Sequence, residues 1–119
     1  MAPLCAAERR VVANILRVDH AGEYAAIRIY EGQCLLARWR APEIVPFLRH
    51  ALEDERGHRT AFESLMRDRR VIPCRTLALW GVAGWVLGLA TGILGRTAVL
   101  VCTEAVSYTH LTLPTIYSV

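Results

Sequence analysis

Two stretches of this sequence have the apolar spacing of amphipathic helices, and both carry ionisable residues where apolar side chains are expected. Glu23 lies in the first stretch, and Glu55 and His58 lie in the second. A charged side chain on the buried face of a helix is costly unless another group compensates its charge. Carboxylates that project from two helices into one core, with Glu-x-x-His on one helix, are typical of a di-iron site in a helical bundle. A metal site is therefore the leading hypothesis for these residues.

The first pattern predicts a helix over about residues 8–38, and the second predicts a helix that begins near Pro46 and ends before Pro73. Three- and four-residue spacing defines the apolar stripe of each helix. The first stripe comprises Val12, Leu16, His20, Glu23, Ile27, Tyr30 and Cys34. The second comprises Leu48, Ala51, Glu55, His58, Phe62 and Leu65. Charged residues such as Arg59 and Glu63 are expected to lie largely outside the second stripe.

The segment from residue 76 to residue 95 contains no charged side chain. Its length reaches the roughly 20 residues with which a helix can span a bilayer. Gly84, Gly88 and Gly92 recur every four residues, a spacing that lets another helix backbone approach closely. We expect a buried or membrane-contacting helix here, broken at Gly95–Arg96 and followed by further helix over residues 97–106.

Four arginines, at positions 67, 69, 70 and 75, precede this apolar segment, and Trp80 and Trp85 lie within it. One interpretation is a solvated helix end, where arginines also suit the helix dipole. The other is contact with anionic lipid headgroups, worth roughly 1 kcal/mol per basic residue, with the tryptophans as interfacial anchors. Beside an uncharged segment of this length, we expect peripheral membrane contact.

The composition narrows the class of protein. With 119 residues the chain is long enough for one small domain with a modest core. The four cysteines form no C-x-x-C pair, which argues against a zinc ribbon or a secreted disulfide framework and suits a reducing compartment. A formal charge of +3 is too small to indicate nucleic-acid binding. All 14 basic residues are arginines, which suggests a GC-rich, bacterial genome.

Residues 107–119 differ in character from the rest of the chain. This stretch, SYTHLTLPTIYSV, has no acidic residue, arginine or lysine. Its threonines and isoleucine favour strand, and Pro114 interrupts helices. It resembles the translation of a transposase-type sequencing adapter. We therefore expect residues 1–106 to be the N-terminal part of the domain and residues 107–119 to be a non-native tail, with the last helix cut off near residue 107.

Each candidate ligand also has a purely structural interpretation. Glu55 and His58 share a helix face because they are three positions apart, so they can form a buried ion pair without metal. Glu23 can pair with an arginine in the core. His20 is expected to be a hydrogen-bonded core histidine, although it lies one turn before Glu23. Asp19 can orient a ligand histidine through its second ring nitrogen.

Three further residues are not expected to be ligands. Tyr24 and Tyr30 are expected in the core, and nothing in the spacing of Glu104 makes it a ligand. The remaining donor set, carboxylates plus imidazole, suits iron or manganese better than zinc.

The string Arg17-Val-Asp-His-Ala-Gly-Glu-Tyr24, followed by Ala25-Ala-Ile-Arg-Ile-Tyr30, resembles the first-helix signature of the demethoxyubiquinone hydroxylase family. Members of this family are ferritin-like di-iron monooxygenases of ubiquinone biosynthesis. The resemblance covers about residues 9–106. It continues through Glu55-Arg-Gly-His58, Leu79-Trp80-Gly-Val and Cys102-Thr-Glu-Ala-Val106.

The resemblance implies an all-α, ferritin-like helical bundle, of which this chain holds the first two helices, the apolar glycine-rich helix and the start of the next. Glu23 would be the first-helix iron ligand, Glu55 a second-helix ligand that bridges two iron ions, and His58 a terminal nitrogen ligand. The family has a further glutamate after the C-T-x-A-V segment and a second Glu-x-x-His on a fourth helix. Here Ser107 follows that segment. Three of the family's six ligands are therefore expected to be absent, and the chain as written is expected to be inactive.

The resemblance further implies a monooxygenase that uses two iron ions and O2 to hydroxylate the ring of a demethoxyubiquinol, a prenylated quinol. It identifies no catalytic residue beyond the metal ligands and no organic cofactor site. Electrons would come ultimately from NADH or from the quinol. The expected location is the cytoplasmic side of a bacterial inner membrane, through peripheral contact. Expected partners are other proteins of ubiquinone biosynthesis, and not nucleic acid.

Two alternatives come from other classes of protein. One is a different ferritin-like di-iron protein, such as an iron store or a peroxide reductase, but the uncharged segment 76–95 argues against it. The other is a non-enzymatic, membrane-associated helical protein in which Glu55 and His58 form a structural pair and bind no iron.

Overall fold

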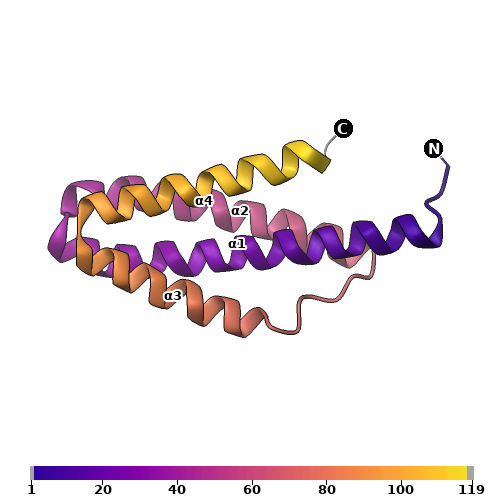
Figure 1. Ribbon diagram of the computed structural model, residues 1–119, viewed down its shortest axis with the longest axis horizontal. Coiled ribbons are helices and arrows are strands. Elements are labelled where there is room, and N and C mark those ends of the chain that lie inside the picture. Colours follow the sequence, from indigo (N-terminus) through magenta and orange to yellow (C-terminus); the bar gives the residue numbers. More distant parts are fainter. Residues whose placement is uncertain (1, 118–119) are drawn as a thin grey trace.

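The chain forms an all-α bundle, as the sequence predicts. The computed structural model describes the backbone of residues 2–117 and the side chains of residues 2–106. The elements are α1 (Ala6–Arg40), the 3-10 turn η1 (Pro42–Ile44), α2 (Val45–Asp68), α3 (Leu77–Leu94) and α4 (Arg96–Tyr117). The long helix α1 lies at the centre, and α2, α3 and α4 all pack along it (Figure 1).

The contact between α1 and α2 is a core of large apolar side chains. Tyr30 of α1 and Leu48 of α2 are fully buried, and Ile27 and Ile44 pack beside them. The chain reverses between the two helices over η1, which has Pro42 at its first position. This short reversal makes α1 and α2 antiparallel neighbours and brings the middle of α1 beside the middle of α2 (Figure 1).

Glycines let α3 approach α1 at backbone distance. A Cβ atom on Gly84 would lie 2.6 Å from the carbonyl oxygen of Ala25, and a Cβ atom on Gly88 would overlap the carbonyl of Ile29. The side-chain amide of Gln33 on α1 also donates a hydrogen bond to the Thr91 hydroxyl on α3, at 3.0 Å. The predicted close approach along the glycine row is therefore confirmed, with α1 as the helix that the row contacts.

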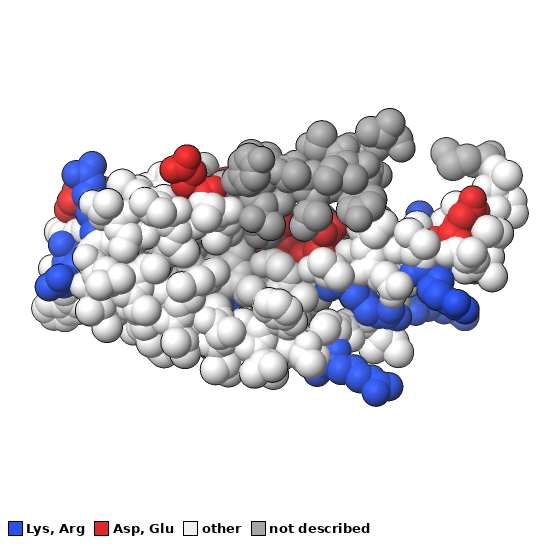
Figure 2. Space-filling model, viewed as in Figure 1, with Lys and Arg blue, Asp and Glu red and all other residues white. Residues whose placement is uncertain are grey.

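The opposite face of α3 is apolar and exposed. Leu79, Val82, Val86, Ile93 and Leu94 are each at least 58% exposed, and Figure 2 shows a broad surface without charged side chains over this helix. By length and composition α3 could cross a membrane, and 22% of the segment is buried inside the bundle. Exposed apolar surfaces of this kind are typical of contact with lipid or with another protein.

The two tryptophans of α3 differ in their surroundings. Trp80 is 52% exposed, whereas Trp85 is half-buried, with the guanidinium of Arg28 5.8 Å from the centre of its ring. The four arginines that precede α3 are all exposed. Their exposure agrees with both the solvated and the headgroup-binding interpretation.

Helix α2 ends in a Schellman cap that carries an arginine at the position glycine usually takes. The N–H of Val71 donates to the carbonyl of Met66 at 2.8 Å, and the N–H of Arg70 donates to the carbonyl of Arg67 at 3.2 Å. Arg70 has a φ angle of +56°, in the left-handed region. This cap turns the chain sharply away from α2 and leaves the following residues beside the first turns of α1.

The buried face of α2 differs from the predicted stripe. Leu48 and Glu55 are buried as predicted, but Leu52 and Met66 are buried as well, whereas Leu65 is 47% exposed. Helical spacing explains the last turn, because Met66 lies 18 residues, or about five full turns, after Leu48 and shares its buried face. Its neighbour Leu65 is turned by about 100° and faces outward.

A glycine separates α3 from α4, which confirms the predicted break. Gly95 has φ and ψ angles of 106° and −168°, a conformation that only glycine adopts without strain. Helix α4 then returns along α1 and buries Val99 and Thr103. It continues to Tyr117, so the prediction that the helix is cut off near residue 107 is wrong. Extending an existing helix avoids the cost of nucleation, and the backbone stays helical despite Pro114, which has no N–H to donate, and despite the strand preference of the threonines and isoleucine.

The glycine contact predicts opposite effects for two alanine substitutions. Gly88→Ala places a methyl group against the α1 backbone, which has no flexible side chain to move aside, and should destabilise the fold by about 1–3 kcal/mol. Gly57→Ala, on the open side of α2 where a Cβ would meet nothing within 4 Å, should stabilise it by up to about 1 kcal/mol. Chemical denaturation followed by circular dichroism measures both changes. Equal effects of the two substitutions would contradict the close contact.

Candidate metal centre

Glu23, Glu55 and His58 meet between α1 and α2. The Nδ1 atom of His58 lies 3.7 Å from Oε2 of Glu23 and 3.7 Å from Oε2 of Glu55. One donor atom from each of the three residues falls within 4.8 Å of the others. The antiparallel packing of α1 and α2 supplies one carboxylate from each helix, and the three-residue spacing on α2 places the imidazole beside its own carboxylate.

The burial of these residues is uneven. Glu23 and Glu55 are only 5% and 8% exposed, whereas the His58 side chain is 59% exposed. The prediction that His58 lies on the buried stripe is therefore wrong, because its side chain lies on the open side of the α1–α2 contact. Two buried carboxylates side by side repel each other and need a compensating positive charge. A metal ion between them would meet that need.

The spacing of the donor atoms suits a single small cation. Iron, manganese and zinc bind oxygen and nitrogen ligands at roughly 2.0–2.2 Å, so two ligands of one ion lie at most about 4.4 Å apart. The 3.7 Å separations between His58 Nδ1 and the two carboxylates fall within this limit, and all three donor atoms lie within 4.8 Å of one another. Two carboxylates and an imidazole also favour iron or manganese by donor type. The residues therefore fit the metal that their pattern predicts.

Next to these residues lies a polar cluster of four side chains that joins α1 to α2. Nε2 of His20 is 3.2 Å from Oε1 of Glu63, and Nε of Arg59 donates to the same oxygen at 2.7 Å. The Arg59 guanidinium also lies 4.8 Å from the centre of the Tyr24 ring. His20 is 2% exposed. It is therefore a hydrogen-bonded core histidine, as predicted, while Tyr30 is buried and Tyr24 is half-buried.

Glu63 is the member of this cluster that sequence reasoning missed. It was expected to lie largely outside the buried stripe, yet its carboxylate holds a buried histidine of the other helix. The four-residue spacing from Arg59 could have revealed the ion pair within α2. The contact with His20 could not have been found in this way, because it depends on the relative rotation of two helices.

Two other predictions are untested. Glu104 is exposed on α4, and the expectation that it is not a ligand stays a prediction. Asp19 is half-buried on α1, and its role in orienting a ligand histidine stays a prediction.

An apolar cavity of about 290 Å³ lies on the other side of α1. Its wall includes Ala25, Ala26 and Ile29 from α1, Leu87 from α3 and Cys102 from α4. Burial raises the pKa of the Cys102 thiol above its ordinary value. Gly22, the residue before Glu23 on α1, is also part of its wall.

Comparison with known proteins gives a consistent result. Residues 10–109 match the family model described as "Ubiquinone biosynthesis protein COQ7". The chain is 43% identical over 96 residues to a 3-demethoxyubiquinol 3-hydroxylase of Rhodospirillum rubrum. It is 42% identical over 98 residues to the mitochondrial NADPH-dependent 3-demethoxyubiquinone 3-hydroxylase of Mus musculus, and 35% identical over 100 residues to the mitochondrial 5-demethoxyubiquinone hydroxylase of Saccharomyces cerevisiae.

The similarity covers most of this chain but less than half of each relative. The three alignments include 81%, 82% and 84% of the chain and 45%, 44% and 43% of the respective relatives. The chain thus spans about half the length of the curated relatives it matches.

The polar cluster predicts a specific pH dependence of stability. Hydrogen bonds from His20, and then from Arg59, lower the pKa of Glu63 below its ordinary value. A lowered carboxyl pKa stabilises the fold at pH values above the unfolded-state pKa, and this stabilisation is lost as the pH falls through the folded-state pKa. Because the Glu63 side chain is 40% exposed, we expect at most about 1 kcal/mol.

The test compares the native chain with Glu63→Gln. The native chain should be the more stable of the two near neutral pH, and the difference should shrink as the pH is lowered below about 4.5, the ordinary range of a glutamate. Urea denaturation at a series of pH values measures this difference in the free energy of unfolding. Glu53→Gln, which alters an exposed glutamate of the same helix, is the control and should show no such trend. A constant difference between the native chain and Glu63→Gln would contradict the assignment.

Proposed function

The chain belongs to the family of the ubiquinone biosynthesis protein COQ7, and we propose on this basis that its full-length form hydroxylates the ring of a demethoxyubiquinol. The observation that carries the proposal is the meeting of Glu23, Glu55 and His58 between two helices. Their donor types and separations suit iron, and their order along the chain matches the first half of a di-iron ligand set. In a ferritin-like bundle, two further helices would supply the remaining ligands.

Each of the three residues has a distinct role in this proposal. Glu23, Glu55 and His58 would hold the metal, with Glu55 as the bridging carboxylate and the other two as terminal ligands that the family resemblance implies. Iron with open coordination positions, once reduced, would supply O2 activation. The two buried carboxylates would face the cation from α1 and α2, with His58 on the open side, and the His20–Glu63–Arg59 cluster fixes the relative position of the two helices.

The apolar surfaces of the bundle suit a prenylated substrate. A long prenyl tail makes a quinol nearly insoluble in water, so the substrate must come from a membrane. The exposed face of α3 offers a membrane-contacting surface. The apolar cavity is lined by residues of α1, α3 and α4. We propose that α3 rests on the bilayer by peripheral contact and that the quinol head passes between α3 and α4 toward the carboxylates.

The remaining assignments follow from the relatives and the composition. Relatives in animals are named as NADPH-dependent enzymes, so a nicotinamide nucleotide is the proposed ultimate source of electrons. The absence of lysine and the similarity to a Rhodospirillum rubrum enzyme suit a bacterial source, for which the cytoplasmic side of the inner membrane is the proposed location. Other proteins of ubiquinone biosynthesis are the proposed partners.

Metal binding tests the site itself. Under anaerobic conditions the chain should bind ferrous iron measurably in equilibrium dialysis, and Glu55→Gln should weaken this binding by about tenfold or more, because it removes a charged ligand. Glu53→Gln, on the exposed side of α2, is the matched control and should bind as the native chain does. Equal binding by all three proteins, or no binding by any, would favour a structural Glu–His pair instead.

Activity tests the proposed reaction. The 119-residue chain should not hydroxylate a short-chain demethoxyubiquinol, because half of the proposed ligand set is missing. Residues 1–106 joined to the C-terminal half of the Rhodospirillum rubrum hydroxylase should restore turnover, measured by mass spectrometry of the quinol, and Glu55→Gln in this chimera should abolish it. Turnover by the 119-residue chain alone, or by the chimera with Glu55→Gln, would contradict the proposal.

A further inference from the structure

A second cavity lies far from the candidate metal centre, between the first turns of α1 and the end of α2. Its volume is about 410 Å³, within the range typical of small-molecule sites. Five of its eight lining residues are arginines, and the other three are apolar; the arginines are Arg9, Arg10, Arg17, Arg69 and Arg70. No acidic side chain lines it.

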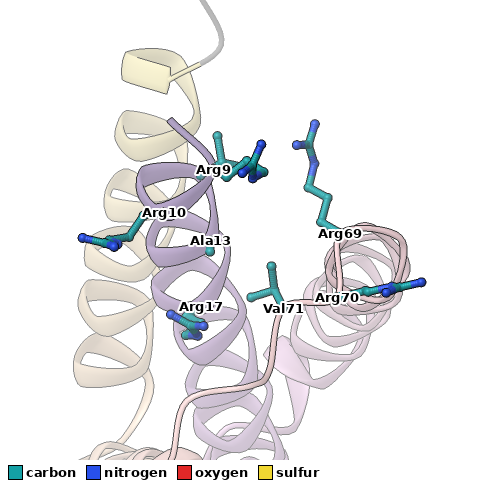
Figure 3. Close-up of a pocket in the computed structure, with 8 residues that line it drawn as sticks. Arg9, Arg10, Ala13, Arg17, Arg69, Arg70 and Val71 are labelled. Carbon is teal, nitrogen blue, oxygen red and sulfur yellow. The ribbon is translucent and has the colours of Figure 1, made fainter. Parts of the chain in front are cut away.

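Arginines line this cavity from both helices. In Figure 3, Arg9 of α1 and Arg69 at the end of α2 extend toward the same space from opposite sides, with Val71 below them. Arg17 lies deeper along α1, while the side chains of Arg10 and Arg70 lie on the two outer flanks and point away from this space. The Schellman cap of α2 creates this arrangement, because it turns the chain at Arg70 and sets Val71 beside α1.

Some of the guanidinium groups are held in place by neutral acceptors. Arg17 donates through Nε to the carbonyl of Ile72 at 2.9 Å and through Nη1 to the side-chain oxygen of Asn14 at 3.1 Å. Arg9 donates through Nη1 to the carbonyl of Leu4 at 2.7 Å. A guanidinium has five N–H donors, so these bonds orient the two groups and leave further donors for a ligand.

The positive charge of the cavity is not neutralised from within the described part of the chain. Elsewhere arginines pair with carboxylates, as Arg28 does with Glu31 and Arg59 with Glu63. None of the five cavity arginines forms a salt bridge with a residue whose side chain the structure describes. Glu8, which precedes Arg9 on α1, accepts a hydrogen bond from the Cys5 N–H instead. Like charges that converge without compensation repel one another, and an anion would relieve this repulsion.

We propose that this cavity binds the phosphate group of a phosphate-bearing anion. Guanidinium groups match phosphate oxygens in charge and in bidentate geometry, and opposing groups such as Arg9 and Arg69 can hold one phosphate from two sides. The phosphate could belong to a soluble phosphate ester or to a lipid headgroup, since the chemistry of recognition is the same. The site shares no residue with the candidate metal centre and does not depend on the proposed hydroxylation.

The experiment removes the two opposing arginines. Arg9→Gln/Arg69→Gln is compared with the native chain and with Arg38→Gln/Arg40→Gln, which removes the same net charge from the exposed other end of α1. Inorganic pyrophosphate is titrated into each protein by calorimetry at low salt. In a second arm, each protein is mixed with phosphatidylcholine vesicles that either contain or lack phosphatidylglycerol, and the bound fraction is measured by flotation. Circular dichroism confirms that all three proteins keep their helical content.

Either arm can support the proposal, and the two arms identify the source of the phosphate. One outcome is that pyrophosphate binds, that Arg9→Gln/Arg69→Gln weakens its affinity about tenfold or more, and that the control pair changes the affinity little. The cavity then binds soluble phosphates. If only vesicles with phosphatidylglycerol bind, and only Arg9→Gln/Arg69→Gln weakens this binding, the cavity takes lipid headgroups. Equal losses for the two double variants would show a general charge effect and overturn the proposal, as would the absence of binding in both arms.

Discussion

The rest of the structure depends on the backbone contact between α1 and α3. Gly84 and Gly88 bring α3 so close to Ala25 and Ile29 that no side chain fits between the helices. This contact occupies one side of α1 and leaves the adjacent side for α2. A glycine-rich helix would be a poor choice on propensity alone, so its stability must come from this packing. The cost in helix propensity is offset by the area that two helices bury at close range.

The position of α1 between α2 and α3 explains why its sequence has small residues on one side and large or charged residues on others. Small residues on the α3 side, such as Ala25 and Gly32, alternate around the helix with Glu23, Ile27 and Tyr30 on other sides. The carboxylate of Glu23 is therefore buried by the same helix pair whose apolar residues form the core. A charged group in such a place is tolerated only with compensation, which is why a cation between Glu23 and Glu55 gives a physical reason for both residues.

Periodicity predicted the elements and the burial of Glu23 and Glu55, because burial of a face depends mainly on spacing along one helix. It did not predict the exposure of His58. The glycine row was predicted for the same reason, since a four-residue repeat places its members along one face. Near the end of α2 the wrong residue was assigned to the buried face: Met66, and not its neighbour Leu65, continues the face of Leu48 and Glu55. Glu63 was missed because its role is a contact with His20 on another helix.

Three surfaces of different chemistry follow from this one arrangement. The carboxylates lie between α1 and α2, the exposed apolar face belongs to α3, and the arginines gather at the end where α1 begins and α2 ends (Figure 2). The segment from Arg69 to Thr76 connects the arginine-lined end directly to the apolar helix. A phosphate bound at the arginine-lined end and an apolar surface in contact with α3 would therefore touch adjacent parts of the chain. Because neither surface includes Glu23, Glu55 or His58, neither would compete with a cation for those ligands.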